Sequence, residues 1–272
     1  MSSTRTMRHL IEHLDDIEKK VKASELVLFL DYDGTLTPIV DKPEKAVIPA
    51  HTRKILKELV ACGAGTVAVV SGRALADVKR AVGVNGIIYA GAHGMELSGP
   101  KLKFQKQVPP AYKKVYAALK SRLHEGLKKF KGAFVEDKGT VLTVHYRLLN
   151  RRRETKLKTF FRETVLPHVA AGQVCVKTGK KVLEVKPAME WDKGKVVLWL
   201  LARKRFSSRH ALLPVYIGDD VTDEDAFKAL GSKGLTIFVG TRRKSHAAYY
   251  LKSYAEVQVF LEWLLQLKCD VI

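Results

Sequence analysis

Short apolar runs that end in polar or glycine-rich turns recur along this chain. Residues 27–30 are all apolar and lead directly into Asp31, and similar runs occupy residues 66–70, 87–90, 214–217 and 235–239. A run that is apolar on both faces is typical of a central parallel strand covered by helices. Segments with helical periodicity lie around residues 10–17, 55–60, 74–82, 197–201 and 257–264. The alternation predicts an α/β fold with a parallel sheet.

The pattern changes in the middle of the chain. Residues 112–130 and 152–169 have helical periodicity, and each is followed by a predicted hairpin, at 133–147 and at 174–185. Two helices and two hairpins in this order form a compact unit of their own. We therefore predict a core from residues 1–107 and 188–272, with an inserted α/β lid domain at 108–187.

Two carboxylates stand at the end of the first apolar run. Asp31 and Asp33 are followed by Gly34, which permits a sharp turn, and by the hydroxyl of Thr35. Open parallel sheets place their chemistry beyond the carboxyl ends of the strands. Paired carboxylates there can hold a hard cation while one oxygen attacks, which indicates phosphoryl transfer through an aspartyl-phosphate. The alternative is ordinary turn chemistry, because Asp, Gly and Thr all favour turns.

Two further strand ends carry polar groups. Ser71 follows the second apolar run, where a hydroxyl and the amides of the next helix can hold a phosphate oxygen. The fourth run leads into a cluster of acids that includes Asp219, Asp220 and Asp223. Such a cluster is repulsive unless a cation lies beside it, so we expect one.

These motifs, in this order, resemble the haloacid-dehalogenase-like phosphatases, and among them the trehalose-6-phosphate phosphatases. The resemblance extends from about Leu26 to the end of the chain and is carried by residues 30–40 (LDYDGTLTPIV), 70–73 (VSGR), 89–96 (YAGAHGME), 184–187 (EVKP) with 191–195 (WDKGK), and 216–227 (YIGDDVTDEDAF). It implies a Rossmann-like core with an inserted cap of the C2 type. The implied reaction is hydrolysis of trehalose 6-phosphate to trehalose and inorganic phosphate with Mg²⁺.

The resemblance also assigns catalytic roles. Asp31 is the expected nucleophile and Asp33 the general acid and base, while Ser71 and Lys193 stabilise charge on the phosphoryl oxygens. The expected ligands of Mg²⁺ are Asp31, the main-chain carbonyl of Asp33, and Asp219, with Asp220 and Asp223 supporting them from outside the ligand set. An all-oxygen site also admits Mn²⁺ or Co²⁺.

Substrate-binding residues are expected in both domains. By the same resemblance they are Arg73 and His93 in the core and Glu136, Lys138, Arg147, Lys180 and Glu184 in the lid, where charged side chains bind the two glucose rings. The alternative for the lid residues is ordinary surface charge on a hairpin. For Arg73 and His93 it is a salt bridge at a helix start and a histidine in a turn.

The positive charge of the chain suggests another class of partner. The formal net charge is +20, and residues 108–187 carry 19 Lys and Arg against 6 Asp and Glu. A basic surface can attract nucleic acid, so a nucleic-acid-binding or scaffold protein on the same fold is one alternative. However, the basic runs lack interleaved aromatic residues, as solvated helix faces do, and we do not expect nucleic acid as a partner. Sucrose 6-phosphate and a glycosyl-phosphoglycerate are the alternative substrates.

The sequence also bears on the cellular location and the oligomeric state of the protein. No apolar run reaches membrane-spanning length, and the first residues predict an amphipathic helix, so we expect no membrane partner. Cys62, Cys175 and Cys269 are far apart and lack metal-ligand spacing, which favours reduced thiols in a cytoplasmic protein. A monomer is favoured.

Overall fold

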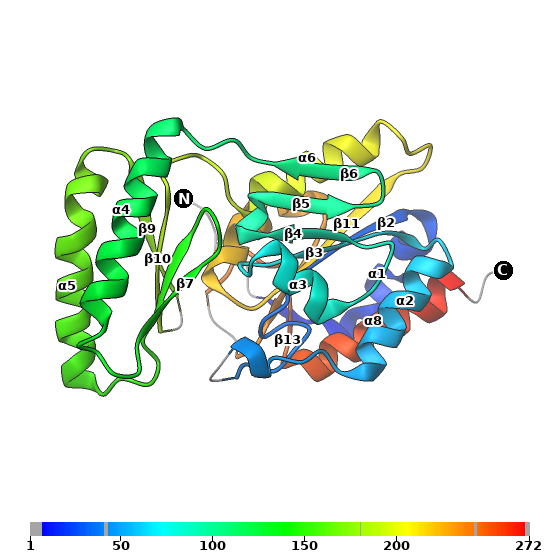
Figure 1. Cartoon of the computed structure of the whole chain (residues 1–272). Helices are drawn as coiled ribbons and strands as arrows, with labels where there is room; N and C mark the ends of the chain where they lie inside the picture. Colours follow the sequence, from blue (N-terminus) through cyan, green and yellow to red (C-terminus); the bar gives the residue numbers. More distant parts are fainter. Residues whose placement is uncertain (1–6, 41–42, 180, 242–243, 270–272) are drawn as a thin grey trace. The chain divides into compact units, whose positions relative to one another are not determined.

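In the computed structural model, the residues described are 7–40, 43–179, 181–241 and 244–269. They form two compact units (Figure 1). The core unit contains the residues up to Phe104 together with those from Trp191 onward, and the inserted unit is Gln105–Glu190. The predicted fold class is confirmed: a mainly parallel sheet forms the core, and an α/β unit is inserted into it.

Within the described residues, nine strands form the sheet of the core unit, in the order β1-β13-β12-β11-β2-β3-β4-β5-β6. Across the sheet in this order, each neighbouring pair between β1 and β4 is parallel, whereas β4 and β5 are antiparallel. The strands are β1 (Arg8–His9), β2 (Glu25–Leu30), β3 (Gly65–Val70), β4 (Ile88–Gly91), β5 (Glu96–Gly99), β6 (Leu102–Gln105), β11 (Leu212–Gly218), β12 (Leu235–Val239) and β13 (Tyr249–Leu251). The first apolar run of the sequence, β2, is therefore a central strand.

Both faces of this sheet are covered by helices, which explains why its strands are apolar throughout. Along β2, Leu26, Leu28 and Leu30 pack into the same cluster as side chains of α1, α2, α3 and α8, whereas Val27 and Phe29 pack with those of α6 and α7. The helices are α1 (Leu14–Ala23), α2 (Ala50–Ala61), α3 (Leu75–Val82), α6 (Lys193–Arg205), α7 (Glu224–Leu230) and α8 (Tyr254–Cys269). None of the helices in the described ranges is long and apolar enough to cross a membrane.

The inserted unit is one antiparallel sheet packed against two helices (Figure 1). Its strands lie in the order β7-β8-β10-β9. Alternate residues such as Leu142, Val144, Leu183 and Val185 are buried with side chains of both helices, as the period of two in a strand requires. The elements are α4 (Pro110–Leu127), β7 (Phe134–Asp137), β8 (Leu142–His145), α5 (Arg151–Ala170), β9 (Val174–Gly179) and β10 (Val182–Pro187).

The prediction of reduced thiols is wrong for two of the three cysteines. Cys62, at the end of α2, and Cys269, at the end of α8, form a disulfide with a Cα–Cα distance of 5.7 Å. The two residues are 207 positions apart in sequence, but α2 and α8 pack side by side on the same face of the sheet. Cys175 is free.

A buried histidine links the first strand to the last helix. The Nδ1 and Nε2 atoms of His9 each lie 2.9 Å from a carboxylate, that of Glu12 and that of Glu256 respectively. Burial alone lowers the pKa of His9, but hydrogen bonds to Glu256 and Glu12 outweigh burial and raise it above 6.5. The charged form of His9 is therefore the form that the fold stabilises.

This link makes stability depend on pH. Because the pKa of His9 is raised in the folded state, its contribution is complete below its ordinary value of about 6.5 and is lost as pH rises through the folded value. We expect the free energy of unfolding in urea to fall as pH rises from about 6.5 through the folded pKa of His9. The His9→Gln variant should lose this slope, and an equal slope in both proteins would contradict the assignment.

Candidate active site

The carboxyl ends of three adjacent core strands meet at one edge of the sheet. Leu30 of β2 is in register with Ile217 of β11 and with Val69 of β3, so these strands end at nearly the same level. Asp31 directly follows β2, and its backbone N–H donates to the carbonyl of Ile217 at 2.9 Å. Ser71 directly follows β3 and Asp219 directly follows β11. The polar strand ends predicted from the sequence are thus neighbours in space.

A group of three buried carboxylates lies at this edge. Asp31, Asp219 and Asp223 each offer an oxygen atom, and these atoms all lie within 4.8 Å of one another. The ammonium of Lys193 lies 2.7 Å from Oδ1 of Asp31 and 2.7 Å from Oδ1 of Asp223. Lys193 keeps only 3% of its side chain exposed, so this ion-pair network is fully inside the core unit.

Local structure fixes Lys193 and Asp223 in place. Lys193 is the first residue of α6, which Asp192 caps by accepting a hydrogen bond from the backbone N–H of Lys195 at 2.9 Å. Asp223 accepts a further hydrogen bond at Oδ1 from the hydroxyl of Tyr216, at 2.7 Å, and at Oδ2 from the backbone N–H of Asp220, at 2.9 Å. Both oxygens of Asp223 are therefore engaged by the protein itself.

Burial and mutual repulsion shift the ionisation of these groups. Burial raises the pKa of Asp31 well above its usual range, Lys193 opposes this effect, and Asp223 and Asp219 add to it. Burial alone would lower the pKa of Lys193, but Asp223 and Asp31 outweigh burial and raise it well above its usual range. Burial, together with the charge of Asp223, also raises the pKa of the Tyr216 phenol. Lys193 is thus a permanent cation in this cluster.

The cluster has the chemistry of a divalent-cation site. Three carboxylates face one ammonium, so two negative charges remain when all the acids are ionised. All the donor atoms are oxygens, the ligands that Mg²⁺ and similar ions prefer. Gly34 has a φ of +83°, and a Cβ at this position would lie 2.3 Å from Oδ2 of Asp219. Only glycine therefore lets the loop after Asp31 approach Asp219 this closely.

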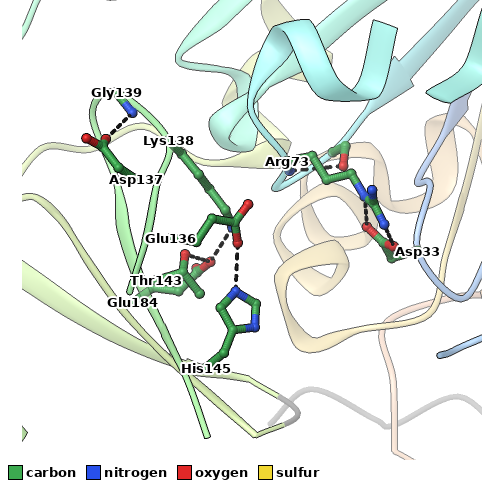
Figure 2. A network of polar contacts seen from close by, with 10 residues as sticks. Asp33, Arg73, Glu136, Asp137, Lys138, Gly139, Thr143, His145 and Glu184 are labelled. Atoms are coloured by element: carbon green, nitrogen blue, oxygen red, sulfur yellow. Dashed lines mark hydrogen bonds and ion pairs between the residues drawn. The ribbon is translucent and has the colours of Figure 1, made fainter. Parts of the chain in front are cut away.

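A second ion pair joins two predicted site residues on the same unit. Arg73 donates from Nε to Oδ2 of Asp33 at 2.8 Å and from Nη2 to Oδ1 at 2.6 Å (Figure 2). Its guanidinium also lies over the ring of Tyr32. The hydroxyl oxygen of Ser71 accepts a hydrogen bond from the backbone N–H of Arg73 at 3.1 Å. The backbone N–H of His93 donates to the carbonyl of Ser71 at 3.0 Å. All four predicted residues in this group belong to adjacent loops.

The inserted unit carries a separate group of polar side chains on the sheet face opposite its helices. Lys138 donates from Nζ to Oε1 of Glu184 at 3.3 Å and lies 3.7 Å from Oε2 of Glu136 (Figure 2). Thr143 donates to the same oxygen of Glu184 at 3.1 Å, and Nε2 of His145 lies 2.7 Å from Oε2 of Glu136. Three of the predicted lid residues, Glu136, Lys138 and Glu184, are thus in one network.

Of the other two predicted lid residues, only Arg147 belongs to the described part of the chain. Arg147 is half-buried in the turn that follows β8. Lys180 falls outside the described residues. Asp220, predicted to support a metal, caps the short helical turn at Val221–Asp223 together with Asp223.

The sequence as a whole settles the family. The profile of the trehalose-phosphatase family matches residues 29–255, which contain every site residue described above. The chain belongs to the trehalose-phosphatase family.

Individual members of the trehalose-phosphatase family support this assignment. The chain is 37% identical over 270 residues to trehalose-phosphate phosphatase B of Arabidopsis thaliana, covering 93% of this chain and 70% of that protein. It is 38% identical over 248 residues to trehalose-phosphate phosphatase of Mycobacterium tuberculosis, covering 89% of this chain and 62% of the mycobacterial protein.

Solved structures show the same fold. The C-terminal domain of the trehalose-6-phosphate phosphatase of Candida albicans superposes with a TM-score of 0.80 at 25% identity, covering 96% of this chain and 99% of that domain. A haloacid dehalogenase-like hydrolase from Bacteroides thetaiotaomicron superposes with a TM-score of 0.61 at 17% identity, covering 89% of this chain and 99% of that one. The second likeness concerns the fold alone.

Three residues of these networks are not predicted as site residues from the sequence. Tyr216 stands in an apolar run and reads as core, yet its hydroxyl anchors Asp223. Thr143 and His145 were assigned only to a strand with alternating polarity, and they hold Glu184 and Glu136. A polar atom on an otherwise apolar strand, three residues before the acid cluster that begins at Asp219, was the available signal for Tyr216.

Proposed function

We propose that this protein is a phosphatase that hydrolyses trehalose 6-phosphate to trehalose and inorganic phosphate, a step of trehalose biosynthesis, with Mg²⁺ as its cation. The observation that carries the proposal is the buried network of Asp31, Lys193, Asp219 and Asp223 at the strand ends of a trehalose-phosphatase family member. Asp31, the main-chain carbonyl of Asp33, and Asp219 would hold the cation. It would offset the charge of the carboxylates and of the phosphoryl group.

In the first step an oxygen of Asp31 attacks phosphorus. A bond forms between this oxygen and phosphorus, the bond from phosphorus to the sugar oxygen breaks, and Asp33 gives its proton to that oxygen. The Lys193 ammonium beside Asp31, and the Ser71 hydroxyl, offset charge on the phosphoryl oxygens. The products of this step are trehalose and the aspartyl-phosphate.

In the second step water attacks the aspartyl-phosphate and Asp33 takes its proton. The bond between Asp31 and phosphorus breaks, which restores the carboxylate and releases inorganic phosphate. Arg73 donates two hydrogen bonds to the carboxylate of Asp33 and thereby fixes the position of its oxygens.

The inserted unit is proposed to act as a cap that binds the sugar. Glu136, Lys138 and Glu184 would form hydrogen bonds with glucose hydroxyls, and Arg147 and Lys180 would assist them. Arg73 and His93 would bind the substrate from the core unit. Within the acid cluster, Asp223 and Asp220 are proposed as supports rather than ligands, since both oxygens of Asp223 already accept hydrogen bonds.

A phosphate-release panel tests this function. We expect catalytic efficiency on trehalose 6-phosphate to exceed that on glucose 6-phosphate by at least about tenfold, because the second ring adds contacts. Sucrose 6-phosphate and glucosyl-phosphoglycerate complete the panel. Equal rates on glucose 6-phosphate would remove the substrate assignment, and faster release from sucrose 6-phosphate would favour that alternative.

A chelator tests the cation. Dialysis against EDTA should lower the rate by at least about a hundredfold, and Mg²⁺ should restore it. Parallel assays with Mn²⁺ and Co²⁺ rank the three metals by the rate that each restores. An unchanged rate after EDTA would remove the metal from the proposal. Cytoplasmic location, a monomeric state and the absence of a nucleic-acid partner stay predictions, and the nucleic-acid alternative is not favoured by a family of phosphatases.

A further inference from the structure

The sheet of the inserted unit has two faces of opposite character. One face packs its apolar residues against α4 and α5. The register of the strands places Phe134 opposite His145, and Glu136 opposite Thr143, which in turn lies opposite Glu184. Because side chains alternate along a strand, these residues share the other face. This face, which we call the polar face, carries Phe134, Glu136, Lys138, Thr143, His145 and Glu184.

The polar face carries the aromatic ring of Phe134. The ring of Phe134 stacks on the imidazole of His145, with centroids 4.6 Å apart and an interplanar angle of 10°. Despite this contact, 44% of Phe134 stays exposed. Among the described residues Phe134 stacks on one ring, and its exposed part presents a flat apolar surface to a molecule that approaches the polar face.

The same stack controls the position of a carboxylate. Nε2 of His145 lies 2.7 Å from Oε2 of Glu136 (Figure 2), while the face of the same imidazole stacks on the Phe134 ring. Glu136 is therefore fixed from one side by His145 and from the other by Lys138, at 3.7 Å. A carboxylate held in this way is oriented before a ligand arrives, which lowers the entropy lost on binding.

We propose that Phe134 is a stacking platform for one pyranose ring of the substrate, and that His145 is a positioning residue that orients Glu136 toward hydroxyls of the same sugar. The inference rests on the proposed function and adds to it two residues outside the set predicted from sequence. A pyranose ring has an apolar C–H face and a rim of hydroxyls. The C–H face matches the Phe134 ring, and the hydroxyls match the carboxylates of Glu136 and Glu184 and the ammonium of Lys138 on the polar face.

The chemistry of the polar face favours a sugar over a protein partner. Charged groups of both signs, Glu136, Lys138 and Glu184, share this face with the aromatic ring of Phe134. The centre of a protein–protein interface is depleted in charged residues and has several apolar anchors. A small ligand with many hydroxyls uses one flat apolar contact and several polar ones, as this face provides.

Steady-state kinetics of matched variants test the platform. Phe134→Leu keeps an apolar side chain but removes the flat ring, and we expect it to raise KM for trehalose 6-phosphate about fivefold while kcat changes little. His145→Asn should also raise KM for this substrate. Neither variant should change KM for p-nitrophenyl phosphate, which has no sugar. Phe134→Tyr keeps the ring and should restore the wild-type KM.

The control is Phe206→Leu, the same substitution at a phenylalanine of the core unit that is 93% exposed. Unchanged KM in Phe134→Leu, or an equal loss on both substrates, would overturn the platform. If the wild-type protein does not hydrolyse trehalose 6-phosphate, the proposed function fails, and calorimetric titration with trehalose decides the platform separately. Weaker binding by Phe134→Leu than by Phe206→Leu supports the platform, and equal binding overturns it.

Discussion

Asp31→Asn is expected to reduce hydrolysis of trehalose 6-phosphate by a factor on the order of 10⁴ or more, because an amide oxygen is too weak a nucleophile to form the phosphoryl intermediate. Asparagine has the shape of the aspartate, so substrate can still bind. The measurement is phosphate release at saturating substrate. A variant with normal turnover would contradict the role of Asp31 as nucleophile.

The same variant separates chemistry from folding. In EDTA-treated buffer it should melt at no lower temperature than the wild type, since the neutral side chain removes repulsion with Asp219 and Asp223 while Lys193 keeps its 2.7 Å contact with Asp223. Asp15→Asn, at an exposed position of α1, is the matched control and should retain full activity. A large drop in melting temperature for Asp31→Asn would show that lost activity reflects unfolding.

Lys193→Met is expected to damage both stability and activity. Methionine fills the space but leaves Asp31 and Asp223 buried without their cation, and removal of one partner of a buried ion pair destabilises a protein by about 3–5 kcal/mol. Loss of a charge that stabilises the phosphoryl oxygens should lower kcat by at least about a hundredfold. Urea unfolding and phosphate release, measured on the same preparation, check the two effects.

Two comparisons make this prediction specific. Lys228→Met, at an exposed position of α7, should change neither quantity. The double variant Lys193→Met with Asp223→Asn should lose less stability than the sum of the single variants, because the second substitution removes a charge that the first left unpaired. Additive losses would mean that Lys193 and Asp223 do not interact as the structure places them.

The central strands of the fold and the core of the site could both be predicted from the sequence, because both depend on local pattern. The apolar run at residues 27–30 identifies a central strand, and such a strand delivers the residue after it, Asp31, to the edge where its neighbours deliver Ser71 and Asp219. Strand direction alone therefore brings these residues together. The short strands β1, β5, β6 and β13 were not predicted, since two to four residues carry too little periodicity.

The contacts that were missed depend on tertiary structure. Alternation showed that His145 and Phe134 are in strands, but only the register of β7 with β8 shows that they stack. Cys62 and Cys269 are 207 positions apart in sequence, so local pattern does not predict their disulfide, and only the packing of α2 beside α8 brings them together. The hydroxyl of Tyr216 reaches Asp223 because the chain turns after β11, and the polarity of the residues alone does not predict this turn.

The order of the core strands has a consequence for synthesis on the ribosome. Central strand β2 has β3 on one side and β11 on the other, and β11 is made about 180 residues after β2. Until residues 212–218 emerge, one edge of β2 has no neighbour, although the inserted unit is already complete. An open edge of this kind pairs readily with other nascent chains. We therefore expect molecular chaperones that bind such edges to raise the yield of active protein from each messenger RNA.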